Sequence, residues 1–407
     1  MKVLNLWIPL LALYSFSYAN DGSNNELEKY ISHSKQQQFD LSYEKNEAES
    51  SKLRDSWISP FNISYSISRD NSLEYINLDE QEQQNASIKW NQPIFQSGGI
   101  YYGIKYATAN EKYANYSLDV QKRKLIKDTI SVLMQIKQID LRIKRQNLQI
   151  QNADISLEQK KEQYLSGQLD SGFLDNAIIE RNYVIQSLYD VQTNKERLIS
   201  KFETLSDMDY KQALIPELQE LSQEEFLKYN IVLKMSESEI EKNGYYKDVT
   251  IAKYLPKISF NAGYNWSGAT NFMGVQQRPD IDYYNYGLTA SIPLDINTFD
   301  DLASARVDFL KSKVLLEDKK RELRAIYEQV IQNINNLNKK KQLSLQNKEI
   351  YKKLLDETKK LLDAGYKTSS DVDLLKNSLL MAELDFAIYE IDKQLELLTL
   401  YEMYKKD

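Results

Sequence analysis

The sequence predicts a mainly α-helical chain with a small membrane β part, and three observations carry this prediction. The 407 residues include only 12 glycines and 7 prolines, which favours a few long regular elements over many short ones. Two stretches of roughly 64 residues contain no helix breaker. Four short stretches alternate between apolar and polar residues, which is typical of strands with one apolar face.

The composition excludes several kinds of chemistry. The chain has no cysteine and one histidine, so thiolate nucleophiles, Cys/His zinc sites and histidine relays lack the residues they need. The 52 basic and 59 acidic side chains give a net charge of −7, which argues against nucleic acid as a partner. We therefore expect no enzyme activity, no catalytic residues, no cofactor and no metal site.

Residues 1–19 are predicted to be a secretory signal peptide. Lys2 precedes an apolar run from Leu4 to Tyr14, and a small-x-small cleavage pattern ends at Ala19. A membrane anchor is the alternative, but the run is too short to span about 30 Å of hydrocarbon. No later run is long enough for a transmembrane helix, so we expect any membrane insertion to use a β-barrel.

The rest of the chain reads as two structural repeats, residues 20–215 and 216–407. Each has the order helix, strand, loop, strand, long helix, tight turn and shorter helix. Prolines in register mark the strands: Pro60 and Pro256 open the first of each pair, and Pro93 and Pro293 close the second. The turns after the long helices share glycine and serine, as Gly167 and Ser171 in one repeat and Gly365 and Ser369 in the other. Chance similarity is the alternative, but the prolines in register favour duplication.

The expected elements follow from the positions of these prolines and glycines and from the periodicity of the segments between them. The first repeat has a helix before its strands, strands at about 58–68 and 85–95, a long helix at about 100–164 and a return helix at about 172–205. The second repeat has a helix at about 223–254, strands at about 257–267 and 284–294, a long helix at about 301–364 and a C-terminal helix at about 371–404. Two return helices together match one long helix in length. This predicts stacked pairs meeting at mid-height, 172–205 with 223–254 and the C-terminal with the N-terminal helix, and a belt at 207–221.

The strands predict contact with lipid. A soluble sandwich would alternate in the same way, but each run is about ten residues long, enough for a tilted strand to cross a bilayer. The polar face is uncharged apart from Lys89, and aromatic residues crowd the strand ends. The residues expected to face lipid are Phe61, Ile63, Tyr65, Ile67, Ile88, Trp90, Phe260, Tyr264, Trp266, Tyr286, Leu288 and Ile292.

Four strands are too few to close a membrane barrel, because the smallest such barrels have eight. We therefore expect several copies to share one barrel, and three copies would supply twelve strands. The loops at 69–84 and 269–282 should then face outside the cell.

The first long helix carries two opposed apolar stripes. Residues Ile136, Ile143, Ile150, Leu157 and Tyr164 recur every seven positions, and Met134, Leu141, Leu148 and Ile155 lie about 200° away around the helix. Two stripes predict a coiled-coil neighbour on each side, as in a ring of helices. The second long helix has one clear stripe, which fits a plain antiparallel bundle equally well.

In this order, the features resemble the outer-membrane efflux protein family typified by TolC. The specific residues are Gln92-Pro93-Ile94-Phe95-Gln96-Ser97-Gly98-Gly99 at a strand-to-helix junction, and Tyr164, Gly167, Ser171, Leu174 and Asp175 at the far turn. The resemblance implies a homotrimer in the outer membrane: a twelve-strand barrel continued by an α-helical barrel through the periplasm. It also implies partners, a periplasmic adaptor protein and an inner-membrane transporter, for multidrug efflux, metal efflux or type I secretion of polypeptides.

The resemblance also implies a periplasmic gate with rings of aspartate. By position, Asp371 matches the first ring and Lys367 stands where the family has a link-forming arginine. Three further positions depart from the pattern: Leu374 replaces the second aspartate, with Asp373 beside it, Leu362 replaces a tyrosine, and Phe173 replaces an aspartate. Asp170 and Asp175 are candidate substitutes. We expect three copies of Asp371 to face the pore axis and favour cations.

Two other functions are compatible with parts of the sequence. A periplasmic adaptor also combines a helical hairpin with β structure, but it should have one hairpin and several compact β-domains. A structural coiled-coil spacer of the envelope would not need the alternating strands.

Overall fold

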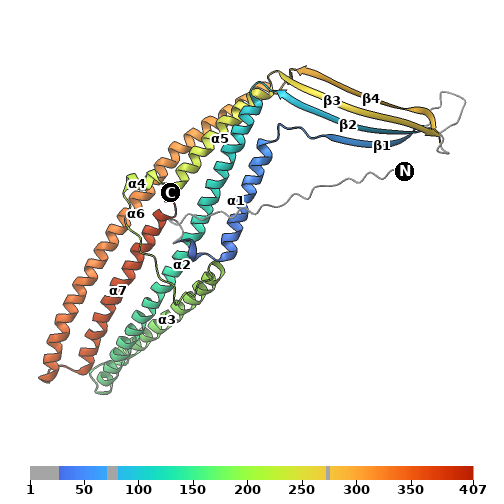
Figure 1. Ribbon diagram of the computed structural model, residues 1–407. Coiled ribbons are helices and arrows are strands. Elements are labelled where there is room, and N and C mark those ends of the chain that lie inside the picture. Colours follow the sequence, from blue (N-terminus) through green and yellow to red (C-terminus); the bar gives the residue numbers. More distant parts are fainter. Residues whose placement is uncertain (1–26, 71–80, 272–275, 407) are drawn as a thin grey trace.

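The computed structural model describes residues 27–70, 81–271 and 276–406 (Figure 1). The predicted signal peptide lies outside these residues. The helices are η1 (Glu28–Tyr30), α1 (His33–Arg54), α2 (Gly99–Leu165), α3 (Ser171–Leu205), α4 (Gln223–Lys228), α5 (Ile231–Lys253), α6 (Thr298–Asp363) and α7 (Ser369–Tyr401). The strands are β1 (Asn62–Asp70), β2 (Gln81–Phe95), β3 (Lys257–Asn271) and β4 (Gln276–Ser291). The fold is thus mainly helical with one small sheet.

The four strands form one antiparallel sheet in the order β1-β2-β3-β4, with β1 and β4 at the edges. The strands differ from their predicted bounds: β1 begins at Asn62, β2 extends back to Gln81, β3 extends to Asn271, and β4 spans Gln276–Ser291. Within the predicted loops at 69–84 and 269–282, residues 69–70, 81–84, 269–271 and 276–282 are therefore strand, and the rest lie outside the described residues. The extra length was missed because polar residues such as Glu82 and Gln84 take over positions that were apolar nearer the helices.

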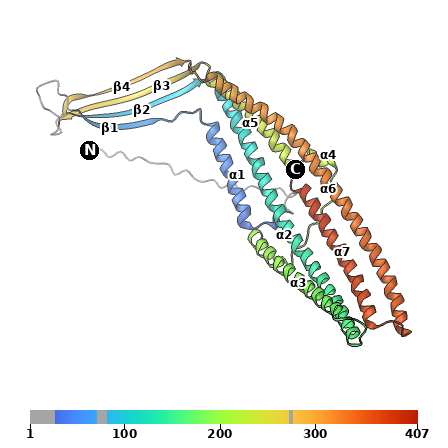
Figure 2. The same ribbon diagram turned by 180° about the vertical axis from the view of Figure 1, so that it is seen from behind.

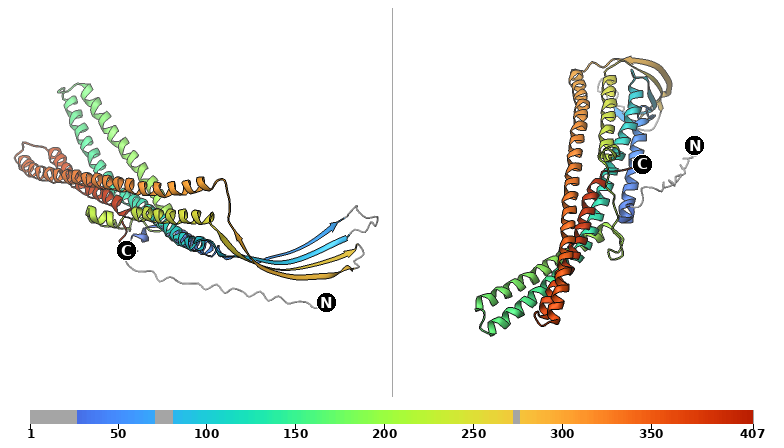
Figure 3. Two further views of the ribbon diagram at one scale, coloured as in Figure 1. Left: turned by 90° about the horizontal axis from the view of Figure 1, so that it is seen from above. Right: turned by 90° about the vertical axis from the view of Figure 1, so that its left-hand side faces the viewer.

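The helices form an elongated body that continues from one end of the sheet, and the hairpin turns lie at the opposite end (Figures 1 and 3). Helix α2 has 67 residues, which corresponds to about 100 Å. In the half nearer the sheet it packs against α1 and α5, and in the far half against α3 and α7 (Figure 2). The two opposed apolar stripes of this helix thus each meet a neighbour.

Among the described residues, helix α6 packs along one flank only. Its neighbour is α5 near the sheet and α7 near the turns, with ion pairs such as Lys253–Asp301 at 3.1 Å and Lys348–Glu383 at 3.0 Å. Its heptad residues Leu323, Val330 and Leu337 are buried on that flank. This fits the single clear stripe seen in its sequence.

The return helices stack end to end, but not in the predicted pairs. The Ser32 N–H donates to Leu205 O at 2.9 Å, which places the start of α1 on the end of α3. Likewise, Ile231 N donates to Met403 O, and Lys405 N to Tyr229 O, both at 2.9 Å, so that α7 meets α5. The four predicted lengths were so similar that their sums could not separate the two pairings.

The same contacts interrupt two of the predicted helices. The helix expected at 223–254 is broken between α4 and α5, because Tyr229 and Ile231 direct their backbone groups to the C-terminal segment. The N-terminal helix is divided into η1 and α1 at Ser32.

The largest hydrophobic core lies at this mid-height level. Phe202, Phe226, Leu323 and Leu398 are all nearly fully buried in it. Residues 206–222, which have no helix, cross the bundle there. They are held by the Tyr30 hydroxyl, which donates to Leu214 O at 2.8 Å, and the Tyr327 hydroxyl, which donates to Leu221 O at 2.9 Å. We call this mid-height level the waist, and the described residues form no comparable hydrophobic cluster elsewhere.

Candidate functional site

One face of the sheet is apolar. Directly paired residues of antiparallel strands lie on the same face, and the pairing gives rows such as Ile63, Ile88 and Tyr264. Phe61 stacks on Trp90 with ring centroids 5.2 Å apart. Ten of the twelve residues predicted to face lipid belong to this face by register, and the other two, Phe61 and Ile292, lie one residue outside β1 and β4. Most of them are exposed in the single chain, with Ile63 at 78%.

The opposite face is polar and carries mainly small side chains. Ser64 and Ser87 share a hydrogen bond of 2.8 Å between their hydroxyls, and the Asn261 amide donates to the Thr289 hydroxyl at 2.8 Å. Lys89 lies in the middle of this face, next to Gly263 on β3, and is exposed. Among the central residues of this face it is the one charged side chain.

The junctions between strands and helices depend on special backbone geometry. Gly98 has φ of +91° and caps α2, a conformation that favours glycine, and Gly99 begins the helix. The neighbouring Ser97 hydroxyl donates to Pro256 O at 2.6 Å, which ties the start of α2 to the start of β3. At Pro93 the β2–β3 register shifts, and Pro293 follows the end of β4. These residues set the angle between sheet and helices.

The two far turns are built alike. Gly167 and Gly365 have φ of +72° and +79° and end the long helices. Asp170 caps α3 by accepting from Gly172 N at 2.7 Å. Thr368 occupies the equivalent position before α7 and forms a capping box with Asp371. Ser171 and Ser369 are the first residues of these helices.

The predicted gate residues are all at these turns, with different surroundings. Oδ2 of Asp371 accepts from the backbone N–H of Thr368 at 3.0 Å, and Lys367 Nζ lies 3.9 Å from its Oδ1. These hydrogen bonds and the nearby cation hold the pKa of Asp371 below its ordinary value of 3.8. Asp373 and Asp175 are exposed on the first turns of α7 and α3. The gate residues of the two hairpins make no hydrogen bond or ion pair with one another among the contacts of the described residues.

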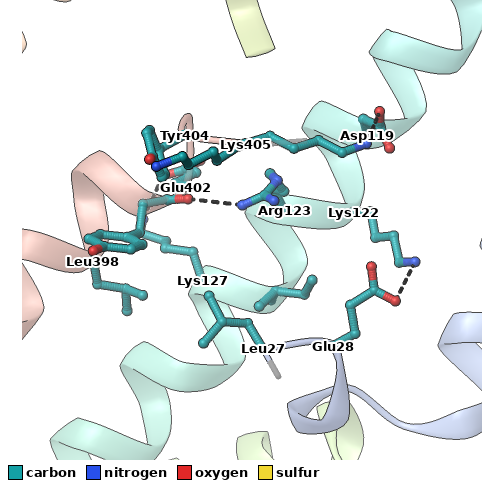
Figure 4. Close-up of a pocket in the computed structure, with 13 residues that line it drawn as sticks. Leu27, Glu28, Asp119, Lys122, Arg123, Lys127, Leu398, Glu402, Tyr404 and Lys405 are labelled. Atoms are coloured by element: carbon teal, nitrogen blue, oxygen red, sulfur yellow. Dashed lines mark hydrogen bonds and ion pairs between the residues drawn. The ribbon is translucent and has the colours of Figure 1, made fainter. Parts of the chain in front are cut away.

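A cluster that the sequence did not reveal lies at the waist, between η1, α2 and the C-terminal segment (Figure 4). Three lysines there each meet an acid from another element: Lys122 with Glu28 at 2.9 Å, Lys127 with Glu402 at 3.5 Å, and Lys405 with Asp119 at 2.9 Å. These pairs join segments that are far apart in sequence, and no local pattern reveals them. These ion pairs join η1, α2 and the C-terminal segment, and they pair most of the charges in the cluster.

Apolar side chains are also exposed along the two outer flanks of the helical body. On α6 they are Val307, Leu310, Val314, Leu315, Leu343, Leu345, Ile350, Leu354 and Leu361. On the α1–α3 side they are Leu41, Leu53, Phe173, Ile178, Ile179, Tyr183 and Tyr189. Exposed apolar stripes on both outer flanks indicate surfaces for association.

Two kinds of feature are absent from the described residues. None of their helices combines the length and the apolar character that a membrane-spanning helix needs. None of their His, Asp and Glu side chains gather in a group of three suited to a metal ion.

Comparison with known proteins gives matches by family and by fold. The family model of the outer membrane efflux protein matches residues 224–404. No curated protein sequence matches this chain. Among solved structures, CusC is similar with a TM-score of 0.71 at 13% identity, covering 96% of this chain and 95% of that one. The outer membrane protein VceC of Vibrio cholerae gives 0.72 at 12%, covering 94% and 96%. The outer membrane channel CmeC of Campylobacter jejuni gives 0.72 at 12%, covering 99% and 95%.

Proposed function

We infer, from the match of the outer membrane efflux protein family model to residues 224–404 and from the TolC-like fold, that this chain is an outer-membrane exit duct for efflux. In this role the sheet belongs in the outer membrane and the helices extend into the periplasm. Substrates pass from an inner-membrane transporter, through an adaptor, into the duct. This is the arrangement of a tripartite efflux or type I secretion system.

The observation that carries the proposal is a one-sided sheet with two open edges. Its apolar face is exposed, and β1 and β4 each have one unpaired edge within the chain. An open edge in lipid would leave backbone groups without partners at a cost of several kcal/mol each. Three copies, with β4 of one beside β1 of the next, remove every edge and give twelve strands. The polar face with Lys89 then lines the lumen.

The helical flanks support the same assembly. The exposed apolar stripe of α6 and that of α1 and α3 lie at opposite ends of the row of helices. In a closed ring, each α6 meets the α1–α3 side of the next copy, and both stripes are buried. A helical barrel then continues the β-barrel.

At the far end, the hairpin turns form the mouth of the tunnel. We propose Asp371, with Lys367, Asp373, Asp170 and Asp175, as the charged residues of the gate. Because Leu362, Phe173 and Leu374 depart from the family pattern, the family's usual links cannot form at those positions. The ion pair between Lys367 and Asp371 supports a gate whose charged residues interact within one hairpin.

The alternatives fit less well. An adaptor would have one hairpin and several β-domains, whereas the described chain has two long hairpins and one sheet. A coiled-coil spacer has no use for a sheet with an exposed apolar face. The function we assign involves passage of substrate and no chemical step.

The test is heat-modifiable assembly in the membrane. The protein is expressed with its own leader, the outer-membrane fraction is extracted in mild detergent, and unheated and heated samples are compared on a denaturing gel. We expect a trimer band that converts on heating to a monomer slightly smaller than the full chain of 47.6 kDa, because the predicted signal peptide is removed. Single-channel conductance of the purified trimer in planar bilayers provides the second readout. A monomer that stays in solution without detergent would overturn the proposal.

A further inference from the structure

The apolar character of the sheet continues past the end of β4, where the sheet meets the helical body (Figure 1). Apolar residues occupy every second position there, and the spacing goes on beyond the last strand residue, Ser291, at Ile292, Leu294 and Ile296. Leu294 is 95% and Ile296 93% exposed, and Phe299, in the first turn of α6, is 83% exposed. We call Leu294, Ile296 and Phe299 the collar residues. Large apolar side chains this exposed and this close together indicate a surface that is covered in the working protein.

The height of a membrane's apolar layer reaches the collar residues. Away from the helices, Asp282 on β4 pairs with Trp266 and is the first charged residue met from the centre of the apolar face. An outward-facing apolar band of about 25 Å, crossed by strands tilted about 40° with a rise of about 3.3 Å per residue, takes about ten residues. Counted from Tyr284, the next residue of this face, that length ends at Leu294, beyond the strand. Ile296 and Phe299 then follow at the level of the lipid headgroups.

The segment between β4 and α6 satisfies polar groups within itself. The Asp295 carboxylate accepts hydrogen bonds from the Asn297 backbone N–H at 2.9 Å and from the Asn297 amide at 3.2 Å. The Asp295 carbonyl oxygen accepts from the Thr298 hydroxyl at 2.6 Å and from the Thr298 N–H at 3.2 Å. Polar groups without partners are costly in contact with lipid. Because these groups have partners, the turn can present Leu294 and Ile296 to an apolar medium.

The helix-side ends of the other strands carry exposed apolar residues too. The register shift after Pro93 pairs Phe95 with Ile258, so that Phe95 lies on the apolar face, where it is exposed. Phe61, just before β1, is also exposed. A neighbouring copy that pairs with the edge strands β1 and β4 does not reach the face of the inner strands β2 and β3. A continuous medium such as lipid, in contrast, covers the apolar side chains at all of these ends.

We propose that the collar residues lie in the periplasmic leaflet of the outer membrane, so that contact with phospholipid extends past the sheet to the first turn of α6. The inference rests on the proposed function, because it takes the apolar face of the sheet to be the lipid-facing one. It adds the position of the bilayer surface, which lies at the start of α6 and not at the end of β4. The collar residues hold the barrel at this depth, since moving it outward or inward would change how much of their apolar area is removed from water.

The test is fluorescence quenching from the lipid and from the water. The chain has no cysteine, so single positions can be labelled. Leu294→Cys, Ile292→Cys and Ser291→Cys are labelled with an environment-sensitive fluorophore, and the purified trimers are reconstituted in phosphatidylcholine vesicles. Ile292→Cys reports on the end of the apolar face, and Ser291→Cys is the matched control, because Ser291 pairs with Lys257 on the polar face. Lipids with a spin label near the headgroup quench from the membrane, and iodide quenches from the water.

We expect lipid quenching at Leu294→Cys to be similar to that at Ile292→Cys and several-fold stronger than at Ser291→Cys, with the reverse order for iodide. Ile296→Cys, labelled in the same way, is the second collar variant and should also be quenched more by the lipid than Ser291→Cys.

Three outcomes are distinguishable from this one. Strong iodide quenching and weak lipid quenching at both collar variants would place them in water, and weak quenching by both agents would place them between copies. Either result overturns the proposal and leaves the sheet in the membrane if Ile292→Cys is quenched by lipid. Loss of lipid quenching at Ile292→Cys as well would overturn the proposed function itself.

Discussion

Oδ2 of Asp371 accepts hydrogen bonds from both the backbone N–H and the hydroxyl of Thr368, each at 3.0 Å. The carboxylate proposed for the gate therefore also holds the first turn of α7. In the other hairpin, Asp170 occupies the position of Thr368 and caps α3 directly. Each turn thus has one acidic residue that stabilises the start of the following helix. The two acids are not at equivalent positions: Asp170 is the N-cap of α3, whereas Asp371 comes three residues after the N-cap of α7.

This double role can be separated with two variants. Thr368→Ala removes the hydroxyl but keeps the charge of Asp371, and we expect lower stability of the turn by about 1 kcal/mol with unchanged ion selectivity. Asp371→Asn keeps an acceptor but loses the charge, and we expect reduced cation selectivity with a smaller loss of stability. Reversal potentials in planar bilayers and thermal melting measure the two effects. Equal selectivity of wild type and Asp371→Asn would remove Asp371 from the gate.

The lowered pKa of Asp371 makes the turn sensitive to acid. Because the folded-state pKa lies below the ordinary 3.8, the ionised carboxylate stabilises the turn above that value. The stabilisation is lost as the pH falls through the lower folded-state pKa. We expect hydrogen exchange in the first turn of α7, corrected for its intrinsic rate, to rise more between about pH 5 and pH 2.5 in the wild type than in Asp371→Asn. The same rise in both proteins would contradict this assignment.

The sequence was sufficient for the architecture because its signals are local. Strand alternation placed Ile63 and Ile88 on one face, and the two stripes of α2 predicted its neighbours. The capping box of Thr368 and Asp371 is also local, because its two residues are three positions apart, although it was not among the predictions. By contrast, the stacking of α1 on α3 depends on the contact between Ser32 and Leu205, and no local pattern specifies it.

The waist was the hardest region to predict. The Tyr327 hydroxyl on α6 donates to Leu221 O, which is 106 positions away, and periodicity carries no information about such pairs. The break between α4 and α5 has the same origin, because the C-terminal segment supplies the competing hydrogen bonds at Tyr229 and Ile231. Long-range contacts decide the structure where the core is thickest.

The two faces of the sheet should respond differently to added charge. Ile88 lies on the apolar face and Ser87, its neighbour, on the polar face. Lysine at Ile88 places a charge toward lipid, which costs about 2–4 kcal/mol near the membrane centre, whereas lysine at Ser87 stays in the lumen. We expect Ile88→Lys to reduce the yield of heat-modifiable trimer and Ser87→Lys to leave most of it. Greater damage from Ser87→Lys would reverse the assignment of the faces.

Lys89 should influence conduction through the β-barrel. Three copies would form a ring of positive charge among serine, asparagine and threonine side chains. We expect Lys89→Glu to shift the reversal potential toward cation selectivity, and the shift to shrink at 1 M salt, where the screening length is about 3 Å. Lys89→Gln, which removes the charge without reversing it, should give an intermediate shift. No shift in either variant would place Lys89 outside the lumen.

The apolar flank of α6 provides the last test, because it addresses the contact between copies. Val314 is 69% exposed in the single chain, within the stripe proposed to meet α1 and α3 of the next copy. Val314→Asp would bury an unpaired charge at that contact, so we expect the trimer band to be lost while the helical signal in circular dichroism remains. Asn338→Asp adds the same charge about 120° away around the helix and should leave the trimer intact. A stable trimer in Val314→Asp would show that the copies meet through another surface.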